Sequence, residues 1–238
     1  MAGRHDLCDT PPGELPARLE ELQEMAKKHQ ERAALQSSGI VAQLARLLTR
    51  EAGKKEEGSV VDQAVELIAS LCCDDASRKD AVDSGAVSAL VQVLTSAPSS
   101  SGGADARVGA VKALLNITQG ACKDRAEVLH AAGALAALAL AQLSGPAEHG
   151  SPGAPGKELG LYLLMALTNL ANGGEALKGV LLKGGAVEAA GAALERWGMA
   201  GGRSVGMQAS KLQIHTVGFE AFGALTFVAA LSSWRSPD

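Results

Sequence analysis

The chain has 238 residues, is rich in alanine and leucine, and carries only 3% aromatic residues. This composition favours helices over strands, and the 28 glycines are expected to punctuate helix boundaries and loops. A formal net charge of −4 without a dense run of lysines and arginines argues against partnership with nucleic acid or an anionic membrane surface. Proteins or small molecules are therefore the expected ligands.

The first eight residues lack the apolar region of a secretion signal. Neither zinc-site nor secreted-disulfide spacing is found among the four cysteines, Cys8, Cys72, Cys73 and Cys122. We therefore expect reduced thiols in a cytoplasmic protein, with the nucleus as an alternative location.

Three apolar stretches are long enough to raise the question of a membrane. Residues 131–143 and 159–171 are about 13 residues each, too short to span a bilayer. Residues 212–231 are long enough, but Gln213 and Glu220 would then lie in lipid. All three stretches are expected to be core helices.

The elements begin with a charged, amphipathic helix over residues 14–35, which follows a flexible segment of 13 residues and suits a cap. A motif of a small residue, glycine and an amphipathic helix then recurs at Gly39, Gly85, Gly133 and Gly185. These glycines are separated by 46, 48 and 52 residues, close to the period of a three-helix repeat. A left-handed backbone at each glycine would let one helix end and the next begin at a sharp angle.

Two further helices complete each cycle. A long helix follows each glycine-led helix, over residues 60–72, 105–118, 157–171 and 211–231. A short helix precedes three of the glycines, over residues 76–82, 122–129 and 175–182. The connecting loops are expected to be tolerated insertions, with an interaction fringe as the alternative, at residues 51–58, 97–104, 145–156 and 198–209.

This cycle resembles the armadillo repeat, which carries a Gly-Ala or Gly-Ile start and an Ala-Leu-x-Asn-Leu core near the end of its third helix. The matching residues are 85–87, 113–117, 133–135, 166–170 and 185–187. The related HEAT repeat fits less well because a short helix precedes the glycines. The resemblance implies an all-α, right-handed α-solenoid of about four three-helix repeats. The expected repeats are residues 14–73, 74–120, 121–172 and 173–232, followed by a tail over 233–238.

In armadillo proteins of the importin-alpha and beta-catenin kind, the third helices line a concave face, and a repeated asparagine binds the backbone of an extended peptide. An amide suits this task because it offers a donor and an acceptor together. The resemblance implies a partner-binding groove formed by Ser70, Lys112, Asn116, Met165, Asn169, Phe222 and Thr226.

The groove positions depart from the family pattern in two ways. Only Asn116 and Asn169 keep the amide. The tryptophan that importin-type grooves carry four residues earlier is replaced by Glu66, Lys112, Met165 and Phe222. A partner of mixed charge is therefore expected rather than a nuclear-import signal. The alternative is that the two asparagines satisfy backbone groups within the stack.

Catalysis finds little support. Gly202–Gly206 matches G-x-S-x-G, but this motif works on a turn between a buried strand and a helix, and here a helix and a glycine-rich loop precede Ser204. The histidines show no metal-ligand spacing. We expect a structural role for Cys122, and neither a cofactor nor a metal.

Two functions remain from different classes. The first is a non-catalytic scaffold or adaptor that binds a peptide or a helical partner on the third helices. The alternative is a structural component that oligomerises through its apolar C-terminal end, which holds Phe219, Phe222 and Phe227. That alternative includes a homodimer through the C-terminal repeat.

Overall fold

The computed structural model describes residues 6–52, 58–96, 101–119, 124–144 and 155–196. The described residues form helices and contain no strand, as the composition predicts. The chain divides into two units, Met1–Ala131 and Ala132–Asp238, and each is considered by itself.

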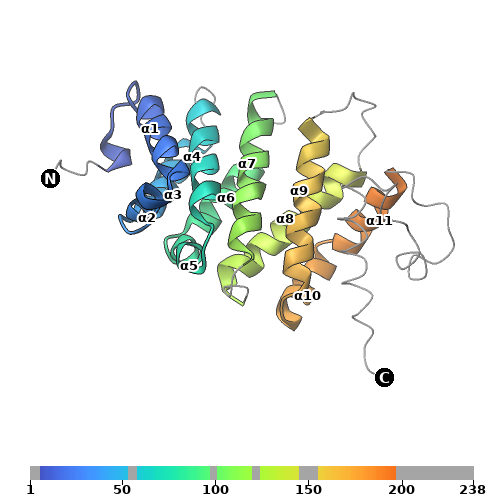
Figure 1. The fold of residues 1–238 in the computed structure, drawn as a ribbon. Helices are drawn as coiled ribbons and strands as arrows, with labels where there is room; N and C mark the ends of the chain where they lie inside the picture. The colour runs from blue at the N-terminus through green and yellow to red at the C-terminus, as the bar shows by residue number, and fades with distance from the viewer. Residues whose placement is uncertain (1–5, 53–57, 97–100, 120–123, 145–154, 197–238) are drawn as a thin grey trace. The chain divides into compact units, whose positions relative to one another are not determined.

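The N-terminal unit begins with a short 3₁₀-helix, η1 (Leu7–Asp9), and its longer elements are all α-helices. These are α1 (Leu15–Lys27), α2 (His29–Gln36), α3 (Ile40–Glu51), α4 (Gly58–Leu71), α5 (Asp75–Asp83), α6 (Ala86–Ser96) and α7 (Ser101–Ile117). Helices α1, α4 and α7 lie side by side in one layer, and α3 packs against α6 (Figure 1). The helices α4 and α7 confirm the predicted long helices at these positions.

The packing of α4 against α7 forms the centre of this unit. Leu67, Ile68 and Leu114 are fully buried, and each such side chain stabilises the fold by roughly 1.5–3 kcal/mol. Gly109 of α7 lies so close to Val65 of α4 that an added Cβ would stand 2.5 Å from Val65 Cγ2. The absence of a side chain at Gly109 therefore sets how closely the two helices approach.

Residues 6–9 are held against α3, in contrast to the flexible N-terminal segment expected from the sequence. The Leu7 side chain is buried, and its backbone N–H donates to Gln43 Oε1 at 3.1 Å. Arg46 forms an ion pair with Asp6, and Arg50 Nη1 donates to the backbone of η1 at 2.7 Å. Gln43, Arg46 and Arg50 lie on one face of α3 by their spacing, so they hold the segment together.

The charged helix expected over residues 14–35 is instead two helices, α1 and α2, which meet at Lys28 in extended conformation. The buried positions Leu15, Leu19, Leu22 and Ala26 keep a helical spacing along α1. Charged and polar residues occupy positions 27–32, so no apolar stripe continues across the break. α1 packs against α4 through this apolar stripe, and the chain turns where the stripe ends.

The C-terminal unit contains α9 (Pro155–Ala171), α10 (Glu175–Lys183) and α11 (Ala186–Arg196), and α8 (Ala126–Ser144) crosses the boundary between the units. The α10–α11 corner packs tightly on α8. A Cβ added at Gly184 would lie 2.7 Å from Ala136 Cβ, and one at Gly185 would lie 2.6 Å from Leu140 Cδ2. The predicted long helix over 211–231 lies outside the described residues.

The predicted left-handed backbone is confirmed at three of the four repeated glycines. Gly39, Gly85 and Gly185 have φ values of 74°, 81° and 83°. At Gly133 the prediction is wrong, because α8 continues through it. The residues directly before the other three glycines are Ser38, Ser84 and Gly184, which are poorer helix formers than alanine, whereas Ala131 and Ala132 favour a continuous helix.

The fusion at Gly133 makes α8 19 residues long, where the sequence predicted a short helix and a separate apolar stretch of about 13 residues. By length and composition alone, α8 could cross a membrane. Core helices of other proteins pass the same test, and α8 carries Glu127 and His130. Its dimensions are therefore weak evidence about a membrane.

Alanine substitution should separate the two kinds of glycine. We expect Gly85→Ala to lower the free energy of unfolding by about 1–2 kcal/mol, because an L-residue is strained at a left-handed φ. Gly133→Ala should raise it by up to about 1 kcal/mol, because alanine is the better helix former and its Cβ meets ordinary van der Waals contact. Urea denaturation followed by circular dichroism measures both changes, and equal effects would contradict the assignment.

Candidate protein-binding surface

A strip of polar side chains runs along α4 and α7 in the N-terminal unit. Glu66 and Ser70 are exposed on α4, one turn apart. Lys112 and Asn116 are half-buried on α7, at the equivalent positions 46 residues later. Because α4 packs directly against α7, the structure brings these four predicted residues onto two adjacent helices. We call them the α4–α7 strip.

The remaining predicted residues are not part of this strip. Met165 and Asn169 are half-buried and lie one turn apart on α9, in the C-terminal unit. Phe222 and Thr226 lie outside the described residues. Of the predicted groove residues, Ser70, Lys112 and Asn116 thus lie on two helices that pack against each other.

Asn116 has a structural contact within the stack. Its Nδ2 donates to the backbone carbonyl of Ala69 at 2.8 Å. Ala69 lies in the last turn of α4, where carbonyl groups have no N–H partner within their own helix. The amide thus satisfies a carbonyl of the preceding long helix and keeps Oδ1 as its remaining acceptor. This is the stacking role that the sequence left open.

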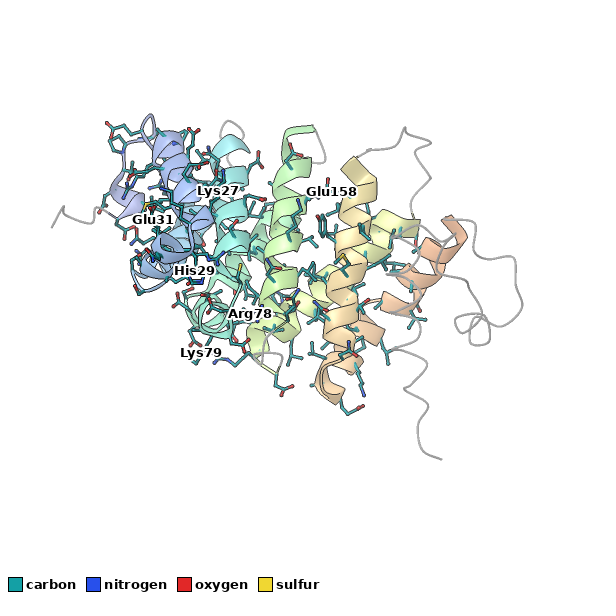
Figure 2. All side chains as sticks on the ribbon, viewed as in Figure 1. Lys27, His29, Glu31, Arg78, Lys79 and Glu158 are labelled. Carbon is teal, nitrogen blue, oxygen red and sulfur yellow. The ribbon has the colours of Figure 1, made fainter. Side chains whose placement is uncertain are left out.

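Other side chains satisfy the neighbouring carbonyls at this end of α4. Gln36 Nε2 donates to the carbonyl of Leu71 at 2.7 Å, and Cys73 Sγ donates to that of Ser70 at 3.0 Å. Arg78, labelled on α5 in Figure 2, donates from Nη2 to the carbonyl of Cys73 at 2.9 Å. The last turn of α4 is therefore fixed by hydrogen bonds from α2 and α7, and the turn after it by one from α5.

Sequence reasoning missed an acidic pair at the other end of the strip. Burial, and secondly the nearby charge of Asp105 on α7, raise the pKa of Asp62 from 3.8 to about 6. Asp62 Oδ1 is buried and has no hydrogen-bond partner within the part of the chain that the structure describes. The four-residue spacing of Asp62, Glu66 and Ser70 was the available signal, because it continues the strip by one turn.

The two adjacent cysteines just after α4 differ in environment. Cys72 is buried, and this burial raises the pKa of its thiol to about 12, so it stays protonated and acts as a core residue. Cys73 is exposed. Both thiols are free, as is that of Cys8. Ser204 and Cys122 fall outside the described residues.

No cluster of three or more His, Cys, Asp or Glu side chains suited to a metal ion occurs among the residues with described positions.

Neither the known protein-family models nor the curated protein sequences include a match to this chain. Solved structures do match it. The designed armadillo repeat protein YIII(Dq)4CqI superposes with a TM-score of 0.67 at 21% identity, over 95% of this chain and 97% of its own. Two engineered proteins superpose with TM-scores of 0.67 and 0.66 at 18% and 20% identity, over 96% of this chain in each case and over 96% and 94% of their own chains. The fold is armadillo-like.

The armadillo-like fold gives the α4–α7 strip its place in the repeat. In each armadillo-like repeat of the N-terminal unit, a short helix and a glycine-led helix precede the long helix that carries the strip. The resemblance inferred from the Ala-Leu-x-Asn-Leu motif is thus confirmed at the level of the fold.

Removing the amide of Asn116 should cost stability. We expect Asn116→Ala to lower the free energy of unfolding by about 1 kcal/mol, because the carbonyl of Ala69 loses its donor. Asn116→Asp should cost more at neutral pH, since a carboxylate would face that carbonyl. Ser70→Ala is the matched control and should change stability little, because Ser70 Oγ bonds only within its own helix. Equal melts for Asn116→Ala and the wild type would refute the stacking role.

The Asp62 carboxyl should make stability depend on pH. A folded-state pKa above the unfolded value means that the native state binds the proton more tightly, so stability falls as pH rises from 3.8 to about 6. Asp62→Asn should remove this dependence and stabilise the protein above about pH 7 by no more than about 1 kcal/mol, since solvent partly screens the group. Urea melts across this range, with Glu66→Gln as the control on the same helix, measure the effect. A decrease in stability above pH 7 on Asp62→Asn would contradict it.

Proposed function

We propose that this protein is a non-catalytic scaffold that binds a peptide or a helical segment of a partner protein on the α4–α7 strip. The observation that carries the proposal is the arrangement of Glu66, Ser70, Lys112 and Asn116 on two adjacent long helices. A repeat array suits recognition because stacking gives a rigid, extended surface that no single repeat could form.

The strip offers both charge signs and several hydrogen-bonding groups. Glu66 contributes an exposed carboxylate, and Lys112 contributes an ammonium group at the equivalent position of the next long helix. Asn116 adds the acceptor Oδ1, because its Nδ2 is already bonded to Ala69. A partner segment with both acidic and basic side chains therefore fits this surface best.

The rigidity of the strip favours binding. The last turn of α4 is held by hydrogen bonds from α2 and α7, and Arg78 of α5 holds Cys73 just after it. Asn116 is itself held by one of these bonds. A surface that is ordered before binding loses less conformational entropy when the partner docks. The same hydrogen bonds thus stabilise the stack and pre-organise the side chains that would contact a partner.

The proposal is tested by affinity purification from a cell extract followed by mass spectrometry, with the full chain as bait. Wild type is compared with Glu66→Lys combined with Lys112→Glu, which inverts the charge order of the strip. We expect partners that bind the strip to decrease at least about tenfold with the variant, because like charges then meet across the interface. The readout is the amount of each captured protein relative to the bait.

Ser88→Lys is the matched control, because Ser88 is exposed on the glycine-led helix α6 rather than on a long helix. It should leave capture unchanged. If the charge-inverted variant and the control retained the same proteins in the same amounts, the strip would not be the binding surface.

A further inference from the structure

An apolar patch is exposed at the α10–α11 corner of the C-terminal unit. Leu182 on α10 and Val187 on α11 are the exposed large hydrophobic residues among the described part of the chain. Gly179 and Gly191 lie three and four residues away from them, and open space surrounds the position that a Cβ would take at each. We call these four residues the end patch.

The position two residues after each repeated glycine is buried in the preceding repeats. Val41, Val87 and Leu135 are 0%, 1% and 0% exposed there, whereas Val187 is 44% exposed. The position three residues before the glycine varies more, with half-buried Gln36, buried Val82 and exposed His130, and Leu182 is 50% exposed. Val187 thus has the residue type of a covered position, but the described residues do not cover it.

The first repeat shows which way these positions face. Gln36, three residues before Gly39, donates to Asp74 Oδ2 at the start of α5 in the following repeat. Val41 lies on α3, which packs against α6 of the following repeat. By equivalence, the end patch lies on the side of its own repeat where a following repeat would pack.

The opposite end of the chain is unsuited to supply that layer. Residues 6–9 cover α3, and α1 packs on α4 with its apolar positions turned inward. Outward, α1 carries the exposed ion pairs Arg18–Glu21 and Lys27–Glu24. A head-to-tail contact between copies would therefore place apolar side chains on charged ones.

The end patch is complementary to itself. Lys183 follows Leu182, and Glu188 follows Val187, and both charged side chains are exposed. A two-fold axis near the α10–α11 corner would bring α10 of one copy against α11 of the other. Lys183 would then meet Glu188 of the second copy. Leu182 would meet Val187 of the second copy, next to the open positions at Gly179 and Gly191.

We propose that the end patch is a self-association site at which two copies of this chain meet about a two-fold axis. The contact joins Leu182 to Val187 of the second copy and pairs Lys183 with Glu188 in both directions. It is a second binding site, separate from the α4–α7 strip. Because the apolar area is small, the dimer is weak, with a dissociation constant on the order of micromolar.

Charge reversal in the full chain tests this contact. Sedimentation velocity at protein concentrations of about 1–100 µM, spanning the expected dissociation constant, measures the monomer–dimer equilibrium. Lys183→Glu alone and Glu188→Lys alone should each weaken dimerisation by about tenfold or more, because like charges then face each other. The double variant should restore it, because the pairs re-form with inverted sign. Failure of the double variant to recover, with both single variants weakened, would refute the two-fold pairing.

A second variant distinguishes a second copy of the chain from the two other possible occupants of the patch, which are the chain's own C-terminal segment and a different protein. Val187→Asp should abolish the dimer and leave the melt of the monomer unchanged. A monomeric wild type whose residues 197–238 lose protection from hydrogen exchange on Val187→Asp would show that the chain's own C-terminal segment covers the patch. A monomeric wild type with unchanged exchange would leave the patch to a different protein. Either result overturns the proposal.

Discussion

The packing of α4 against α7 is the contact on which the rest of the N-terminal unit depends. It requires a residue without a side chain at Gly109, and it brings the Asn116 amide to a carbonyl that α4 cannot satisfy itself. α7 thus provides both the close packing and the hydrogen-bond donor for α4. Burial of apolar side chains provides most of the stabilisation, while the hydrogen bond fixes the register between the two helices.

The same contact explains why binding and stability share residues. One side of a long helix packs on the other helices of its own repeat, and its two adjacent sides pack on the long helices of the neighbouring repeats. Only a narrow strip of its surface therefore remains for a partner. Within the α4–α7 strip, Asn116 is the residue that also contacts the neighbouring helix. Its Nδ2 donates to Ala69 of α4, and its Oδ1 remains as an acceptor for a partner. Glu66 and Ser70 lie farther out and are free to differ in charge and size without disturbing the core.

The two ends of the described chain differ in how much apolar surface they leave exposed. A repeat array leaves an apolar surface wherever stacking stops, because each repeat is built to be covered on both sides. At the N-terminal end, η1 and α1 bury Leu7 and Leu19 and turn charged residues outward. At the α10–α11 corner, Leu182 and Val187 stay exposed between opposite charges. A surface of this composition is the expected place for a further protein layer.

Periodicity in the sequence determined the helices, the recurrence of glycines and the armadillo-like fold, because these follow from local backbone preference and from apolar spacing. The residues of the α4–α7 strip came instead from the resemblance to the armadillo repeat. The tertiary structure decided what local preference leaves open. Residues 6–9 lie against α3 because three side chains of that helix hold them. The continuation of α8 through Gly133 follows local preference instead, because the two preceding alanines favour a helix. The raised pKa of Asp62 and the hydrogen-bond partner of Asn116 were beyond the sequence, since the first depends on burial and on Asp105, 43 residues away, and the second on Ala69, 47 residues away.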